Sequence, residues 1–149
     1  MGVSIRCEKT RTGADLTYIG FARFRKLVAE CCGPGWALHY KKLLQTPKER
    51  ALSSARAESD EELDAITADM IRRRAVPVKI VDFLLQPDEG GRIHHGACRT
   101  ILRRLERRNV HDDPLYGYAA WGSDATRLSH VMRVLRACVE SKSDLTWSG

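Results

Sequence analysis

Arginines at helical spacing are the residues of this sequence whose type and order point most directly to chemistry. Five of them lie close together: Arg99, Arg103, Arg104, Arg107 and Arg108. On a helix this spacing places guanidinium groups on the face opposite the apolar Ile101 and Leu105. A guanidinium fits phosphate in a bidentate manner. The run predicts a phosphate-binding helix face with Arg99, Arg103 and Arg104 as ligands. A solvated helix face is the competing interpretation.

Aromatic residues follow the arginine run almost at once. Tyr116, Tyr118 and Trp121 lie in a predicted loop, and Gly117 and Gly122 give that loop conformational freedom. Aromatic side chains stack on unpaired bases in many nucleic-acid-binding proteins. The rings are therefore predicted to stack on the base of the ligand whose phosphate the arginines hold. A packed aromatic loop that binds nothing is the alternative.

The sequence contains side chains that can bind metals, but they are too few in any one place to form a metal site. His94, His95 and Cys98 offer nitrogen and sulfur ligands on one predicted helix, but zinc needs three or four fixed ligands and no second cluster exists. The segment from Asp82 to Arg99 has the outline of a calcium-binding EF-hand, with Gln86 at the first position of its loop. Ala97, however, stands where the bidentate glutamate of such a loop belongs. The sequence therefore predicts no metal and no cofactor.

Three residues near the last predicted helix have the side-chain types of a catalytic triad. Ser123, Asp124 and His130 contain the atoms of a nucleophile, an orienting acid and a base. They lack the strand, sharp turn and helix of a nucleophile elbow, and no oxyanion loop accompanies them. A hydrolase is therefore disfavoured. The sequence favours a binding protein without catalytic residues.

The charge balance favours an anionic partner. The net charge of +6 results from 25 basic and 19 acidic side chains, and arginine supplies most of the positive charge. A basic surface attracts anions. A genome rich in G and C also writes arginine where another writes lysine, so this second explanation stays open. The expected ligand is a nucleotide, with nucleic acid as the alternative. A host protein and a second copy of the chain stay open as further partners.

Length and cysteine content restrict the class of protein. The 149 residues, of which 43% are hydrophobic, predict a single domain spanning 1–149. No run of about 18 uncharged apolar residues occurs, and Arg6 interrupts the N-terminus too early for a signal peptide. The five cysteines are odd in number and include no Cys-x-x-Cys pair, which favours buried thiols in a reducing compartment. The expected location is the cytoplasm of a host cell, away from membranes.

Two periodicities predict the elements that position these residues. Ser4–Glu8 and Asp15–Ile19 alternate apolar and polar side chains and predict a β-hairpin, and Asp144–Trp147 predicts a strand that pairs with it. Helical spacing and end signals predict helices over 21–31, 36–44, 60–74, 76–85 and 94–108, and a last one that begins near residue 123. Residues 47–59 are small and polar, and 86–93 is a predicted turn. The expected fold is α+β: a small antiparallel sheet, made of the N-terminal hairpin plus the C-terminal strand, packed with four or five helices.

Three segments of the chain carry a resemblance: Met1–Gly2 with the strand that follows and Tyr18–Arg25, then Phe83–Leu102, and then Cys138–Trp147. They resemble a group of small uncharacterised phage and mobile-element proteins, and none of them is a known active-site motif. Members of the group often carry an acidic Asp-x-Asp-Gly turn where this chain has Pro87–Gly91. The resemblance implies a viral or mobile-element setting and no specific chemistry.

The combined expectation is a non-catalytic phage or mobile-element protein that binds a phosphate-bearing ligand. The first candidate ligand is a host defence signalling nucleotide, which the protein would sequester. The alternative is an inhibitor that binds a nucleic acid or a protein, as anti-CRISPR proteins do. Ion pairs from Arg99 and Arg103 to acids such as Asp60 or Glu61 would remove the basis of the phosphate prediction.

Overall fold

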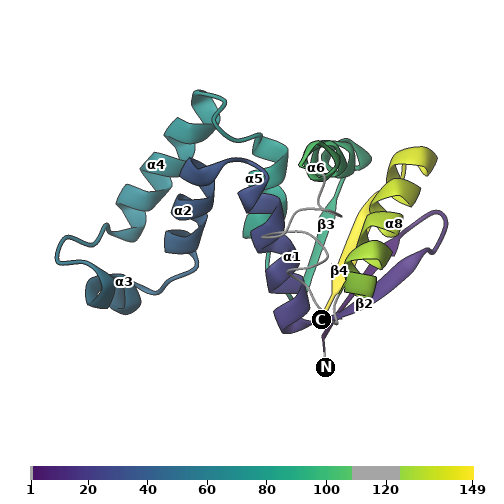
Figure 1. Ribbon diagram of the computed structural model, residues 1–149, viewed down its shortest axis with the longest axis horizontal. Helices are drawn as coiled ribbons and strands as arrows, with labels where there is room; N and C mark the ends of the chain where they lie inside the picture. The colour runs from purple at the N-terminus through teal and green to yellow at the C-terminus, as the bar shows by residue number, and fades with distance from the viewer. Residues whose placement is uncertain (1, 109–124) are drawn as a thin grey trace.

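The computed structural model of the chain describes residues 2–108 and 125–149 and has an α+β architecture (Figure 1). Its strands are β1 (Gly2–Cys7), β2 (Gly13–Thr17), β3 (Gly90–Ile93) and β4 (Leu145–Ser148). The helices of the described residues are α1 (Tyr18–Glu30), α2 (Pro34–Leu43), α3 (Pro47–Ser53), α4 (Asp60–Arg72), α5 (Val78–Leu85), α6 (His95–Arg107) and α8 (Ala125–Ser141). The predicted fold class is confirmed. The described part of the chain has more helices than the four or five expected.

The strands form one antiparallel sheet in the order β2-β1-β4-β3. β1 pairs with β2 as the predicted hairpin. β4 pairs with the other edge of β1, where Trp147 stands opposite Ile5. The predicted pairing between the C-terminal strand and the N-terminal hairpin is therefore confirmed. β1 is a central strand, and its hydrogen bonds run to both sides.

β3 lies where the sequence predicted only a turn. Its Gly91 stands opposite Trp147, and a Cβ atom on Gly91 would lie 2.1 Å from the Cζ2 atom of the indole ring. The ring therefore occupies space that only a glycine leaves open. Gln86 holds the second half of this strand, because its Oε1 accepts from the Arg92 N–H and its Nε2 donates to the Arg92 carbonyl, each at 2.9 Å. The paired glycines thus belong to a strand that covers the sheet edge beside β4.

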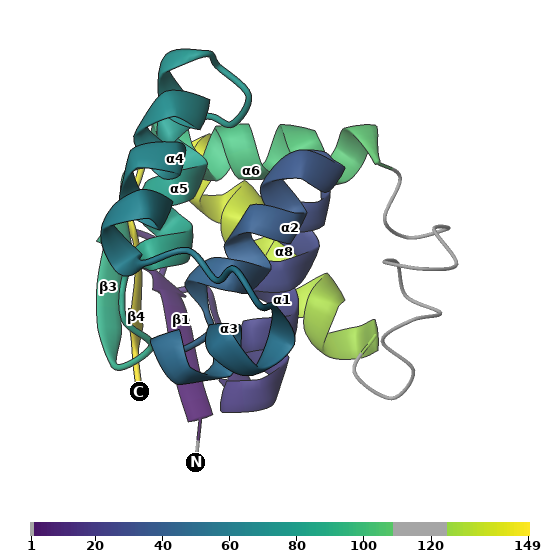
Figure 2. The ribbon, with the colours of Figure 1, turned by 90° about the vertical axis from the view of Figure 1, so that its left-hand side faces the viewer.

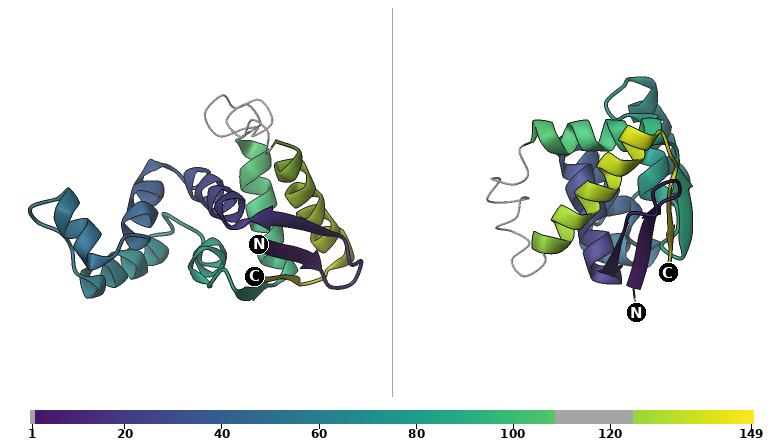
Figure 3. Two further views of the ribbon diagram at one scale, coloured as in Figure 1. Left: turned by 90° about the horizontal axis from the view of Figure 1, so that it is seen from below. Right: turned by 90° about the vertical axis from the view of Figure 1, so that its right-hand side faces the viewer.

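One face of the sheet carries the core, and the other face is polar. Along β1, Val3 and Ile5 are buried, whereas Ser4 is half-buried and Arg6 is exposed. α1 and α8 pack against β1 and β2, and α6 packs against α8. Figures 1 and 3 show these helices together on one side of the sheet. The fold is therefore a sheet layer with a helical layer that includes the arginine helix α6.

α1 begins earlier than the sequence predicted, because its cap lies in the residue that ends β2. The Thr17 hydroxyl accepts the Gly20 N–H at 2.9 Å, which satisfies one backbone donor of the first helical turn. The predicted strand Asp15–Ile19 is therefore wrong for its last two residues. Tyr18 and Ile19 belong to the first turn of α1, and Ile19 is 72% exposed.

Arg25 of α1 lies inside the core, in an aromatic cage formed by Phe21, Phe83 and Trp147. Its guanidinium carbon is 4.5 Å from the centre of the Phe21 ring, 5.3 Å from that of Phe83 and 5.5 Å from that of Trp147. The residue is only 6% exposed. Cation–π attraction is strongest where the cation has lost its water, as it has here. The cage therefore joins α1, α5 and β4 around one buried positive charge.

The polar contacts of Arg25 hold the chain that follows α5. Nη1 donates to the carbonyl oxygens of Gln86 at 2.6 Å and Leu84 at 3.3 Å, and it lies 3.4 Å from Oδ1 of Asp88. Nε and Nη2 have no hydrogen-bond partner within the described residues. Burial lowers the pKa of Arg25, and the charges of Tyr40 and Asp88 oppose that effect. Arg25 thus ties α1 to the residues that lead into β3.

α2, α3 and α4 form a helical lobe on the side of α1 away from α8 (Figure 1), and Figure 2 shows α2 between α4 and α1. Nε2 of His39 is hydrogen bonded to Oγ1 of Thr67 at 2.8 Å, which links α2 to α4. Arg50 of α3 is buried, donates to the Glu58 carbonyl at 3.1 Å and pairs with Asp60. Two buried polar side chains therefore hold the helical lobe together.

The five cysteines are all free. Cys7, Cys98 and Cys138 are fully buried, and Cys31 and Cys32 are half-buried. The predicted buried thiols of Cys98 and Cys138 are therefore confirmed. Within residues 2–108 and 125–149, no helix is both long enough and apolar enough to cross a membrane.

Candidate functional site

α6 presents three arginines on its outer face, opposite the apolar stripe that packs on α8 and α5. His94 caps the helix, because its Nδ1 accepts the Gly96 N–H at 3.2 Å. Arg99, Arg103 and Arg107 are exposed on the far side of the helix from the core. Figure 3 shows α6 beside α8 in the helical layer. The exposed positions expected for Arg99 and Arg103 are therefore observed.

Arg104 and Arg108 lie at the border of the buried stripe and face the end of α1. Arg104 is half-buried, and Nη1 of Arg108 donates to the Glu30 carbonyl at 3.4 Å. Burial raises the pKa of Cys32 to about 11, and the nearby charge of Arg104 opposes this rise. The structure therefore separates the three predicted ligands. Arg99 and Arg103 share the outer face of α6, and Arg104 turns toward α1.

Six arginines in other parts of the described chain have carboxylate partners. The pairs are Arg6–Asp15, Arg25–Asp88, Arg50–Asp60, Arg72–Asp69, Arg73–Asp69, Arg92–Glu8 and Arg92–Asp144. No ion pair within the described residues involves Arg99, Arg103, Arg104 or Arg107. Asp60, one of the acids that could have neutralised Arg99 or Arg103, pairs with Arg50 instead. These four arginines of α6 therefore lie outside ion-pair distance of every acid in the described chain.

The N-terminal end of α6 adds to this positive region. Burial lowers the pKa of His95, and the neighbouring His94, Arg99 and Lys142 lower it further, while Asp144 raises it. The two histidine rings are 3.9 Å apart between their centres. Lys142 follows the end of α8, so the cations near His95 come from both helices. His95 therefore lies close to cations of both helices and to one carboxylate.

Five residues with predicted roles lie outside the described part of the chain. They are the aromatic ligands Tyr116, Tyr118 and Trp121 and the triad residues Ser123 and Asp124. Their roles stay predictions. Across residues 2–108 and 125–149, no group of three or more histidine, cysteine, aspartate and glutamate side chains could hold a metal ion.

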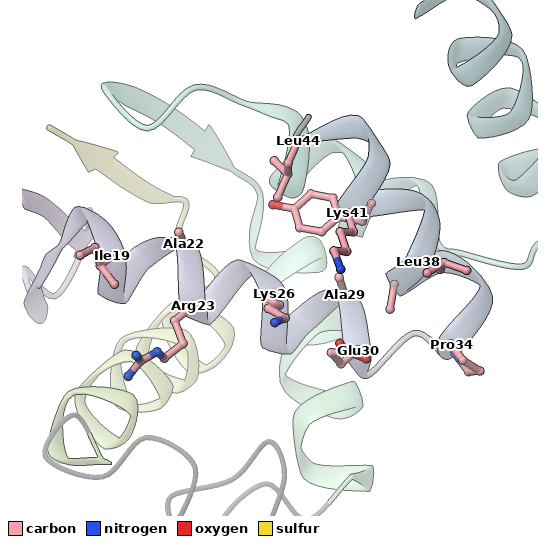
Figure 4. A pocket seen from close by; sticks show the side chains of 12 residues that line it. Ile19, Ala22, Arg23, Lys26, Ala29, Glu30, Pro34, Leu38, Lys41 and Leu44 are labelled. Carbon is pink, nitrogen blue, oxygen red and sulfur yellow. The ribbon is translucent and has the colours of Figure 1, made fainter. Parts of the chain in front are cut away.

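A groove between α1 and α2, of about 630 Å³, was not predicted from the sequence (Figure 4). Both helices contribute aliphatic and charged side chains to it, among them Ile19, Lys26, Glu30, Leu38, Lys41 and Leu44. A signal was present in the sequence. Ile19, Leu38 and Leu44 are large apolar residues outside the buried stripes of their helices. Such residues indicate a second apolar face.

No protein-family model, no curated protein and no solved structure matches this chain. The resemblance of three segments to phage and mobile-element proteins therefore stays a prediction from the sequence. The described part of the chain offers two candidate binding surfaces: the outer face of α6 and the groove between α1 and α2.

Proposed function

We propose that this chain is a non-catalytic binding protein that captures a phosphate-bearing ligand on the outer face of α6. Arg99 and Arg103 contact the phosphate groups, and Arg104 contributes positive charge from the side that faces α1. The first candidate ligand is a host defence signalling nucleotide, sequestered by a phage or mobile-element protein. Tyr116, Tyr118 or Trp121 stacks on its base in this proposal.

The observation that carries the proposal is the lack of carboxylate partners for the α6 arginines within the described residues. Six arginines elsewhere are paired with acids, whereas Arg99, Arg103 and Arg107 are exposed. A phosphate group can bind these side chains without displacing an internal ion pair. Residues four apart on a helix are about 6 Å apart along its axis. Arg99 and Arg103 can therefore contact two phosphate groups of one ligand.

A second candidate function is a nucleic-acid-binding inhibitor of the anti-CRISPR kind. The outer face of α6 favours it because three arginines stand in one row on an exposed helix face. A row of cations suits an extended polyanion, and each neutralised phosphate releases counterions, which makes such binding steeply salt-dependent. A nucleotide bound by two arginines depends less on salt. Salt dependence therefore separates the two candidates.

The test is a thermal-shift screen against cyclic and linear nucleotides, short DNA and short RNA at two salt concentrations. A ligand at 100 times its Kd adds about 2.7 kcal/mol to the free energy of unfolding. For a domain of this size each kcal/mol raises Tm by about 2–4 °C, so the expected shift is roughly 5–10 °C. A shift with one nucleotide that persists at high salt supports capture of that nucleotide. A shift with DNA or RNA that disappears at high salt supports the inhibitor.

Matched variants connect any shift to α6. Arg99→Gln together with Arg103→Gln is expected to weaken binding at least about tenfold, because each charge-assisted hydrogen bond contributes about 1.5–3 kcal/mol. Arg72→Gln together with Arg73→Gln removes the same charge from exposed arginines that pair with Asp69, and it is expected to leave binding within about twofold. Equal affinities for the two double variants, or no shift with any of these ligands, would refute the proposal.

A further inference from the structure

We infer that the groove between α1 and α2 is a docking site for a short, acidic, amphipathic helix of a partner protein. This surface is separate from the outer face of α6, so the inference goes beyond the proposed phosphate binding. It rests on three properties of the groove: its exposed aliphatic side chains, the sign of its charge, and its length.

The groove exposes large aliphatic side chains on both of its walls. Ile19 on α1 is 72% exposed, and on the α2 side Leu38 is 63% and Leu44 is 64% exposed. Ala22, an exposed small residue of α1, also lines the groove and lets another chain approach the backbone of α1 closely. Exposed aliphatic side chains gathered around one groove mark a candidate interaction site. The occupant must therefore offer an apolar stripe of its own.

The charged residues of the groove select the sign of the occupant. Lys26 and Lys41 line it, and Glu30 is the acid among its lining residues. Figure 4 shows Lys41 extending from α2 toward α1, while Lys26 lies on the opposite wall. Positive residues beside an apolar floor are complementary to carboxylates that flank an apolar stripe. The favoured partner surface is therefore acidic and amphipathic.

The shape of the groove favours a helix over a nucleic acid or a membrane. From Ile19 to Glu30 the α1 wall extends for about 16 Å, which matches about three turns of a docked helix. Helices bind such grooves with apolar anchors at positions i, i+4 and i+7. The mostly apolar lining and the carboxylate of Glu30 disfavour phosphate. A concave surface between two helices also cannot lie flat on a bilayer.

The probe for this inference is a displayed library of random helical peptides, about three turns long, selected on the full chain. Peptides enriched on the wild-type protein are expected to be net acidic and to carry aliphatic residues at i, i+4 and i+7. Enrichment of basic or uncharged peptides, or no enrichment, would overturn the inference. So would concentration-dependent self-association that Lys41→Glu abolishes, because a second copy would then be the occupant.

Matched variants place the enriched peptide in the groove. Lys26→Glu together with Lys41→Glu is expected to weaken its binding at least about tenfold, and Leu38→Asp is expected to do the same. Lys48→Glu together with Lys79→Glu makes the same charge change at exposed lysines outside the groove and is expected to leave binding unchanged. Circular dichroism verifies that each variant is folded. Equal losses in both lysine pairs would show a general charge effect and contradict the assignment.

Discussion

Replacement of Arg25 tests whether one buried guanidinium holds the turn between α5 and β3. Arg25→Ala removes the hydrogen bonds to the carbonyls of Leu84 and Gln86, the ion pair with Asp88 and the packing in the aromatic cage. Arg25→Met removes the polar contacts but keeps most of the side-chain volume. The difference between the two variants therefore separates the polar contribution from the packing contribution.

The expected loss of unfolding free energy follows from the contacts of the Arg25 guanidinium. Two charge-assisted hydrogen bonds contribute about 3–6 kcal/mol in total. The buried Nε and Nη2 groups, which have no partner within the described residues, offset part of this by about 1–3 kcal/mol each. The central values nearly cancel, so we expect Arg25→Met to lower the free energy of unfolding by only about 0.5 kcal/mol. Arg25→Ala adds lost methylenes and a cavity, for a total of about 2.5 kcal/mol.

Urea unfolding followed by circular dichroism measures these losses. Lys26→Ala is the control, because Lys26 is exposed on the same helix and its truncation is expected to change stability by less than about 0.5 kcal/mol. The slope of the unfolding free energy against urea should stay constant across the set. A loss below about 1 kcal/mol for Arg25→Ala would refute the reasoning, since the buried guanidinium would then contribute no net stability.

Two further predictions concern the helical lobe and β3. Burial lowers the pKa of His39 below its ordinary value of 6.5, so the unfolded chain takes up a proton below that pH while the native chain does not. The free energy of unfolding should therefore fall as the pH drops from 7 through 6.5 toward the native pKa, and His39→Gln should flatten this fall in urea titrations at each pH. Gly91→Ala should lower Tm by several degrees, because its Cβ would overlap the Trp147 ring. Gly35→Ala, which meets no atom within 4 Å, should leave Tm unchanged or raise it, and equal melting shifts would contradict the role of Gly91.

The spacing of apolar residues predicted most of the helices, because burial on one face of a helix repeats every three to four residues. Polarity hides α3. A capping box marks its start, in which the Thr46 hydroxyl accepts the Glu49 N–H and the Glu49 carboxylate accepts the Thr46 N–H, with Pro47 at the first helical position. The sequence also did not predict β3, for a different reason. Its glycines have the composition of a turn, and only the position of Trp147 makes them part of a strand.

For the candidate surfaces, the sequence predicted the features that depend on the periodicity of a single helix, such as the exposure of a side chain. The exposure of Arg99 and Arg103 follows from their angle to the apolar stripe of α6. The burial of Arg25 also had a signal, since it follows Phe21 by four positions within an apolar stripe. No local pattern in the sequence predicted which carbonyls Arg25 contacts, because Leu84 and Gln86 are 59 and 61 positions away from it. The groove likewise depends on how α1 packs against α2, which no local pattern specifies.

The central place of β1 has a consequence for the synthesis of the chain. β2 follows β1 directly, whereas β4 leaves the ribosome last among the strands of the described sheet. Cys7 and Ser141, in contact beside the β1–β4 pair, are 134 positions apart, and a ribosome that adds about 5–20 residues per second needs roughly 7–27 s between them. During that interval one edge of β1 has no strand partner and is open to pairing with other chains. Translation of β4 therefore closes the sheet and ends the period in which the nascent protein is most prone to aggregate.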